Sequence, residues 1–415
     1  MDPILLLVLF GAGALGFYMA WNIGSNDVAN SMATAVGAKA ITFKQAAIIA
    51  GVLNFVGAVF VGSHVTETIK GNIVNPELIG NTTYLLLGFI ASLLAASIFV
   101  MLSTWKEMPI STTHSVIGAM VGFGIVASGL TCINWTKLGE VALSWVLSPI
   151  AGCILAFIIF RTIVKLIFAK ENPVEAARVV GPGIIGITVA LIVSSLFLKT
   201  PLGDKLGVTG LQQILAISGG CGIIGAVASA LALRRIKIRQ GDEYDTVERI
   251  FRKLQIVTSC YVAFSHGAND VANAIGPVAG VFSIVTSGGT FNPVAEVPIS
   301  LLALGGIGIA IGCLTWGHKV MKTLGYRITA LTNTRGFSVD FGAATTVLVA
   351  SKLGLPISTS HTVVGAVIGV GLARGLDAVD LKVIKRIIAS WLLTVPAAAA
   401  LSGIIFILLK SIVVG

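Results

Sequence analysis

Two short polar peptides each occur twice along the chain, in the same order. The first is Asn-Asp-Val-Ala-Asn, at 26–30 and 269–273, and the second runs from Pro-Ile-Ser to His, at 109–114 and 356–361. They interrupt a sequence of 415 residues that is 55% hydrophobic and only 11% charged. Carboxylates, amides and hydroxyls kept twice in such surroundings indicate a duplicated chain that builds one polar site from two halves.

The first peptide carries the ligands of a hard cation. An aspartate in the middle of a membrane costs at least ~2.5–3.5 kcal/mol unless it is paired or solvated, and Asp27 and Asp270 each have asparagines beside them. Glycines two residues ahead, Gly24 and Gly267, would let each helix break and free carbonyl oxygens. Together these oxygens favour Na⁺ or H⁺; the alternative is a pair of helix caps or packing devices. The predicted cation ligands are Asp27, Asp270, Asn26, Asn30, Asn269 and Asn273.

The second peptide is typical of a helix that starts inside the membrane. Proline suits the first turn of a helix, and the hydroxyls and unpaired N–H groups that follow can bind a tetrahedral anion at the positive end of the helix dipole. The alternative is N-capping and close helix packing alone. The predicted phosphate-binding residues are Ser111, Thr112, Thr113, Ser358, Thr359 and Ser360.

Three histidines lie in or near these peptides. We interpret His114 and His361 as residues that tie the helix starts to their neighbours, although a role as proton carrier or donor to the anion stays open. His266 precedes only the second Asp and is a less symmetric candidate. Two further acids have structural interpretations: Glu107 as a charge at the membrane edge, and Asp340 as the partner of Arg335 in a local ion pair.

Long apolar runs must position these peptides. Soluble domains carry roughly 25% charged residues, so a soluble protein is excluded, and each run is near the ~20 residues that cross a bilayer as a helix. We interpret the first run as a retained helix, since no basic segment precedes it. The five cysteines show neither metal nor disulfide spacing. The runs are 4–20, 43–62, 82–104, 139–160, 181–199, 211–233, 297–317 and 386–409.

Basic residues in the loops predict the topology. Loops 161–178, 234–253, 319–335 and 374–386 are rich in Lys and Arg, which places them in the cytoplasm. The expected fold is an all-α polytopic membrane protein of about 12 transmembrane helices with both termini outside. It comprises two inverted five-helix repeats with broken helices (1–160 and 254–415) and a linker with two central scaffold helices (161–253). Inverted repeats are typical of secondary transporters.

Both pairs of peptides together resemble the inorganic phosphate transporter family, PiT, from about 21 to about 374. The resemblance implies Na⁺- or H⁺-coupled uptake of inorganic phosphate, often by a homodimer. It also implies that the Asn-Asp segments and the Ser/Thr segments line the cation and phosphate sites. The short middle region is similar to that of compact prokaryotic members.

The sequence therefore predicts a symporter in the cell inner membrane that imports inorganic phosphate with Na⁺ as coupling ion and has no cofactor. No ATPase motif is present. The alternatives are proton coupling and a carrier for sulfate or another oxyanion. A further alternative is an enzyme that holds a divalent metal with His114, His361 and the two aspartates. The sequence, however, lacks the His-Glu-x-x-His pattern of such sites.

Overall fold

A computed structural model describes residues 3–69, 73–199, 203, 206–234, 243–292, 296–352 and 357–414. Within these ranges all named elements are helices, and the only β pairing is an isolated bridge between Val74 and Ile133. The prediction of an all-α polytopic membrane protein is confirmed. Pro356, the first residue of the second Pro-Ile-Ser peptide, lies outside the described residues.

The helices fall into three stretches of the chain. The first contains α1 (Pro3–Gly37), α2 (Phe43–Ile69), α3 (Pro76–Ile79), α4 (Thr82–Trp105), α5 (Thr112–Ser128), η1 (Leu130–Cys132) and α6 (Trp135–Ile163). The middle contains η2 (Val164–Phe168), α7 (Pro173–Lys199) and α9 (Leu211–Arg234). The last contains α10 (Glu243–Thr286), α11 (Ile299–Thr315), α12 (His318–Lys322), η3 (Thr323–Arg327), α13 (Asn333–Lys352), α14 (Thr359–Leu372), η4 (Leu376–Ala378) and α15 (Leu381–Val413).

Several of these helices are long and apolar enough to cross a membrane. Among the described residues there are 8 such helices, and α11 with the bent segment His318–Arg327 makes a ninth. The apolar helices α5 and α14 are shorter, with 17 and 14 residues. At 1.5 Å per residue they reach about 20–26 Å, less than the full hydrocarbon thickness of ~30 Å. The count of twelve crossings stays a prediction.

The helices that carry the two Asn-Asp segments are continuous. α1 runs unbroken past Gly24, and α10 runs unbroken past Gly267, so the expectation that these glycines break their helices is wrong. A Cβ on Gly24 would overlap the backbone of Ile309 in α11, and one on Gly267 would overlap that of Asn54 in α2. The glycines therefore let backbones approach closely, as small residues do between membrane helices.

The breaks lie instead ahead of α5 and α14, which begin deep in the protein with Thr112 and Thr359. Each helix is held by glycines against one neighbour. Gly118 and Gly122 of α5 contact the backbone of α15, and Gly365 and Gly369 of α14 contact that of α6. The packing role of these small residues is thus confirmed.

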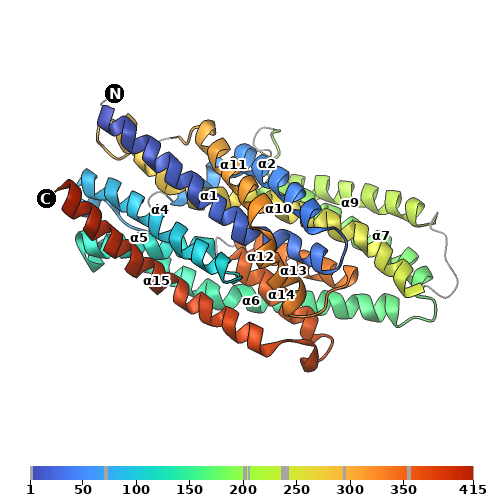
Figure 1. The fold of residues 1–415 in the computed structure, drawn as a ribbon. Coiled ribbons are helices and arrows are strands. Elements are labelled where there is room, and N and C mark those ends of the chain that lie inside the picture. The colour runs from blue at the N-terminus through green and yellow to red at the C-terminus, as the bar shows by residue number, and fades with distance from the viewer. Residues whose placement is uncertain are drawn as a thin grey trace.

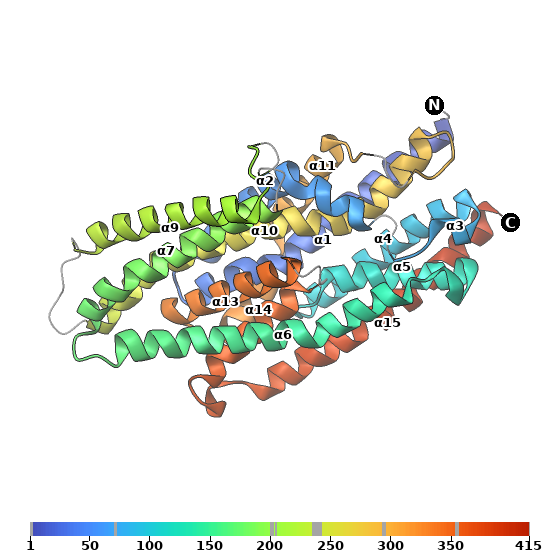
Figure 2. The same ribbon diagram turned by 180° about the vertical axis from the view of Figure 1, so that it is seen from behind.

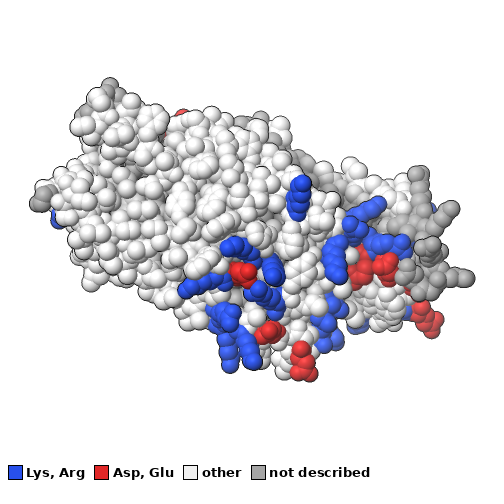
Figure 3. Space-filling model, viewed as in Figure 1, with Lys and Arg blue, Asp and Glu red and all other residues white. Residues whose placement is uncertain are grey.

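The ends of the molecule differ in charge. Both termini lie at the same end of the helix bundle (Figures 1 and 2). On the face seen in Figure 3, the Lys and Arg side chains gather toward the opposite end, mixed with a smaller number of Asp and Glu, and the part near the termini is almost free of charge. This asymmetry agrees with a cytoplasmic location for the basic loops.

Candidate functional site

Residues from three helices converge on the carboxylate of Asp27. Thr112 at the start of α5 donates its hydroxyl to Asp27 Oδ2 at 2.6 Å, and Ser360 in α14 donates to Oδ1 at 3.2 Å. Asn30, one turn along α1, donates its amide to Ser360 Oγ at 2.8 Å and to Asp27 Oδ1 at 3.1 Å. One predicted cation-binding segment thus meets hydroxyls from both predicted phosphate-binding segments.

The second half of the chain forms a related contact around Asp270. The amide of Asn273 donates to Asp270 Oδ1 at 3.3 Å and to Thr113 Oγ1 at 3.0 Å. Asn273 of α10 therefore reaches across to the start of α5, as Asn30 of α1 reaches across to α14. The four polar peptides of the sequence come together in one place.

His266 lies between the two aspartates. Its Nε2 is 2.6 Å from Asp270 Oδ2 and 3.8 Å from Asp27 Oδ2, and ligand atoms of these three buried side chains all lie within 4.8 Å of one another. On its other side, Nδ1 is 2.6 Å from Oδ1 of Asn54 in α2. The Asn54 amide nitrogen donates to the Ala50 carbonyl, so Oδ1 accepts from His266 and Nδ1 carries a proton.

Two carboxylates this close can both stay ionised only if a positive charge lies between them. The side chains of Asp27 and Asp270 are buried, with 1% and 5% of each residue exposed, and uncompensated charge at such depth is strongly destabilising. A protonated imidazole of His266 or a bound cation would supply the compensation. The sequence made His266 a weak candidate for the site, because the first half of the chain has no matching histidine. Its position one helical turn before Asp270 was the feature that could have indicated contact with that carboxylate.

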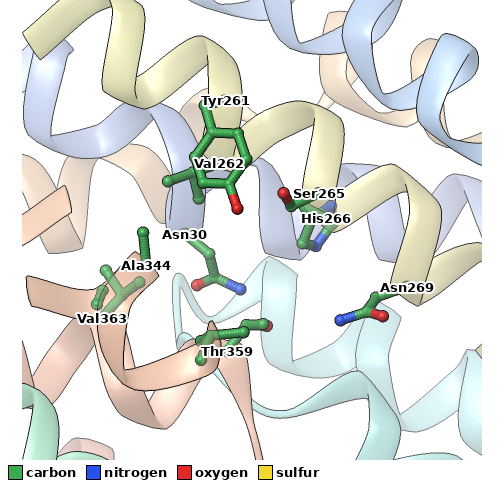
Figure 4. Close-up of a pocket in the computed structure, with 11 residues that line it drawn as sticks. Asn30, Tyr261, Val262, Ser265, His266, Asn269, Ala344, Thr359 and Val363 are labelled. Carbon is green, nitrogen blue, oxygen red and sulfur yellow. The ribbon is translucent and has the colours of Figure 1, made fainter. Parts of the chain in front are cut away.

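A small cavity adjoins this cluster (Figure 4). Its volume of about 30 Å³ holds roughly two water molecules. Asn30 projects into it from α1, Thr359 from α14, and His266 and Asn269 from α10. Three residues predicted from the sequence therefore line the same space. The remaining lining residues are Tyr261, Val262, Ser265, Ala343, Ala344, Val347 and Val363.

Asn26 is placed outside the carboxylate cluster. Its amide nitrogen donates to Thr104 Oγ1 at 2.8 Å and to the Met108 carbonyl at 3.1 Å, and its oxygen accepts from the Ile110 N–H at 3.2 Å. These bonds fix the non-helical segment ahead of α5 against α1. Asn26 thus positions the helix start that carries Thr112.

Ser111 and Ser358 cap the helices that follow them. Each Oγ accepts the backbone N–H of the histidine three residues on, His114 or His361, at 3.3 Å. Capping of this kind satisfies a donor that the first turn leaves unpaired. The N-capping alternative is therefore a real role of these two serines, while the other four hydroxyl residues face the cluster or its cavity.

The histidine rings of the two peptides lie against each other. Their centroids are 4.9 Å apart, and the His361 ring stacks on Trp391 of α15 at 3.9 Å. His114 lies 5.3 Å from Trp145 of α6. Nδ1 of His114 and both ring nitrogens of His361 bond none of the described hydroxyls of the site, and this placement supports the interpretation that the two histidines hold the helix starts.

The predictions for the two remaining acidic residues, Glu107 and Asp340, have different outcomes. Glu107 pairs with Arg327 at 2.6 Å near the surface, as expected of a membrane-edge charge. Asp340 forms no ion pair among the described residues and accepts hydroxyl hydrogen bonds from Thr34, Ser259 and Thr258 at 2.7, 2.6 and 3.4 Å. The predicted pair with Arg335 is wrong, because Arg335 donates to the Ala330 carbonyl instead.

The fold and this polar cluster define a multi-pass membrane protein with a buried polar site that contains two carboxylates. A model of the phosphate transporter family matches residues 23–402, and the chain belongs to that family. The members of this family are transporters, so the alternative of an enzyme is wrong. The resemblance inferred from the duplicated peptides is confirmed.

Relatives extend along nearly the whole chain. A Pyrococcus furiosus protein named as a phosphate permease is 50% identical over 405 residues, covering 98% of this chain and 96% of its own. The chloroplast inorganic phosphate transporter 2-1 of Arabidopsis thaliana is 40% identical over 427 residues, covering 96% of this chain and 71% of its own. A solved structure of a sodium-dependent phosphate transporter superposes with a TM-score of 0.89 at 47% identity, covering 98% of this chain and 100% of that one.

Proposed function

We propose that this protein is a secondary active symporter that imports inorganic phosphate with a sodium gradient. The observation that carries the proposal is that hydroxyls from both helix starts bond Asp27, while Asn273 joins Asp270 to the Thr113 hydroxyl. Carboxylate and hydroxyl groups suited to opposite ionic charges share one buried site. The similar solved structure is that of a sodium-dependent phosphate transporter, and this similarity supports the choice of sodium.

Phosphate would bind at the starts of α5 and α14. Thr112, Thr113 and Ser360 already direct hydroxyls to the cluster, Thr359 lines the cavity, and Ser111 and Ser358 would contribute through the helix ends they cap. The cluster and the described cavity lining contain no Lys or Arg. The charge of phosphate would therefore be balanced by helix dipoles and by co-bound cations, which gives a physical reason for coupling.

Sodium would bind to the carboxylate and amide oxygens of Asp27, Asp270, Asn30 and Asn273. Asn269 would take part from the cavity wall, and Asn26 would act by fixing the segment before α5. Bound sodium would take the place of the hydroxyl protons that now face Asp27. Proton coupling is the alternative, and His266 favours it, because a protonated imidazole is a competing positive charge between the same carboxylates.

Alternating access would follow from two inverted repeats, 1–160 and 254–415, joined by a linker with two scaffold helices. Helix pairing supports this proposal: α1 packs on α11 as α10 packs on α2, and α5 packs on α15 as α14 packs on α6. Rocking of one repeat against the other would expose the midplane site to either side. We place the protein in the cell inner membrane, with about twelve crossings, as a homodimer.

Uptake of labelled phosphate into proteoliposomes tests the proposal. Uptake should follow an imposed inward Na⁺ gradient and fail under a pH gradient alone. Uptake that a pH gradient drives without Na⁺ would replace the sodium proposal by proton coupling. Sulfate added in excess distinguishes the oxyanion alternative, since a phosphate carrier keeps its uptake and a general oxyanion carrier loses it.

A further inference from the structure

One tryptophan of α15 contacts both of the peptides that we assign to the anion. The indole Nε1 of Trp391 donates to the carbonyl of Pro109 at 3.3 Å, in the segment ahead of α5. Its ring stacks on that of His361 in the first turn of α14, with 3.9 Å between the centroids and 24° between the planes. Both contacts are buried, because 8% of Trp391 is exposed. A single side chain therefore holds the starts of both helices.

The segment between α4 and α5 is held from two sides. On the side of α1, Asn26 accepts a hydrogen bond from the backbone N–H of Ile110. On the side of α15, Trp391 donates to the carbonyl of Pro109, the residue before it. Thr112 follows two residues after Ile110 and is the first residue of α5. A shift of the segment would therefore move the Thr112 hydroxyl relative to the rest of the site.

Helix packing sets the position of Trp391. One turn further along α15, the backbone of Val395 lies against Gly118 of α5, and after a second turn that of Ala399 lies against Gly122. Close crossings at small residues fix neighbouring membrane helices against each other. Because residues four apart share one face of a helix, Trp391 lies on the face that packs on α5. Its indole therefore projects from a backbone that is fixed relative to α5.

The other half of the chain has a related arrangement. On α6, Trp145, Pro149 and Cys153 follow one another at the same spacing, and the backbones of Pro149 and Cys153 lie against two glycines of α14. The Trp145 ring lies 5.3 Å from that of His114 in the first turn of α5. A tryptophan beside a helix start thus occurs twice, as the polar peptides do.

We propose that Trp391 is a positioning residue that sets the affinity of the site for phosphate. Its N–H and its ring hold the starts of α5 and α14 at the separation at which hydroxyls and first-turn N–H groups of both helices reach one anion. Outer groups of this kind keep the binding groups in place. The role rests on the proposed function of these helix starts. Trp391 spends its N–H on the Pro109 carbonyl, so it acts through that segment.

Equilibrium binding of labelled inorganic phosphate to the purified full chain in saturating NaCl tests this role, together with uptake into proteoliposomes. W391F keeps a ring against His361 and loses the N–H, so Kd and KM for phosphate should rise about two- to tenfold. W391L also loses the stacking, and both constants should rise about ten- to a hundredfold. The maximal uptake rate and the half-saturating Na⁺ concentration should stay as in the wild type. The control W135F loses a 2.9 Å bond from Nε1 to the Leu130 carbonyl at an exposed position and should match the wild type.

Three results would overturn this role. The first is equal phosphate affinity of W391F and the wild type, and the second is a rise in W135F as large as that in W391F. The third is a W391F variant that keeps its phosphate affinity but has a lower maximal rate and a lower unfolding midpoint, which would make Trp391 a general support of the fold. A wild-type protein that binds no phosphate in NaCl would instead overturn the proposed function, and this inference with it.

Discussion

Nε2 of His266 lies 2.6 Å from Oδ2 of Asp270, while the opposite ring nitrogen is held by Asn54 of α2. This contact places an imidazole at the point where the carboxylates of both halves of the chain approach each other. Any cation that binds there competes with the charge that the ring can carry. The coupling ion and pH should therefore be linked through a single side chain.

We first predict that His266→Gln removes proton competition. As pH falls, an imidazolium between the two carboxylates should raise the Na⁺ concentration needed for half-maximal phosphate uptake by the wild type. The variant should show a nearly constant requirement. Na⁺-dependent uptake across a pH series measures this, with His318→Gln, an exposed histidine of α12, as control. The same pH dependence in wild type and H266Q would exclude the role of the ring.

We next predict that Asp27→Asn and Asp270→Asn each abolish coupled uptake in a folded protein. Either change removes a charge that balances a cation, and the amide still fits the space. Proteoliposome uptake should fall to background, while size-exclusion profiles match wild type. Asp377→Asn at an exposed position serves as control. Near-normal uptake by either site variant would make that aspartate structural.

The hydroxyl of Thr112 should contribute about ten- to a hundredfold to phosphate uptake. Thr112→Val keeps the shape but leaves a charged oxygen of Asp27 without its 2.6 Å donor, and hydrogen bonds to charged groups contribute ~1.5–3 kcal/mol. The measurement is kcat/KM for phosphate at saturating Na⁺. Thr345→Val, whose hydroxyl donates to the Phe341 carbonyl in α13, should keep wild-type values; equal losses in both would contradict a site role.

Gly24→Ala and Gly267→Ala should destabilise the fold. A methyl at either position meets the backbone of a neighbouring helix, and overpacking of this kind costs ~1–3 kcal/mol. Thermal unfolding in detergent should show a lower midpoint for both. Gly139→Ala in α6, where a Cβ meets nothing within 4 Å, should not lower it. An unchanged midpoint in the two variants would mean that the helices separate freely at these crossings.

Much of the site could be predicted from the duplicated peptides alone. The residue types of Asp27, Thr112 and Ser360 indicated opposite charges at one place, and the structure brings those side chains together. The continuity of α1 and α10 could not be read in this way, because a glycine inside a helical pattern is compatible with a break or with a close crossing. Only the position of Ile309 or Asn54 opposite the glycine distinguishes the two.

The roles of single polar residues depended on neighbours far along the chain. Asn26 and Asn30 have the same side chain in the same peptide, yet one holds the segment before α5 and the other joins Asp27 to Ser360. Asp340 finds its donors in α1 and α10 rather than near Arg335. Such partners are fixed by tertiary packing, on which local spacing carries no information.

The contact between the His114 and His361 rings, 4.9 Å apart, has a mechanical consequence. Through this contact the N-termini of α5 and α14 pack together as one unit, with Trp145 against His114 and Trp391 against His361. We expect a displacement of one helix N-terminus to be transmitted to the other. Sodium that binds in one half of the site should therefore raise the affinity of the other half for sodium. Uptake should then depend on sodium concentration with a Hill coefficient above one, and loss of the ring contact should make that dependence hyperbolic.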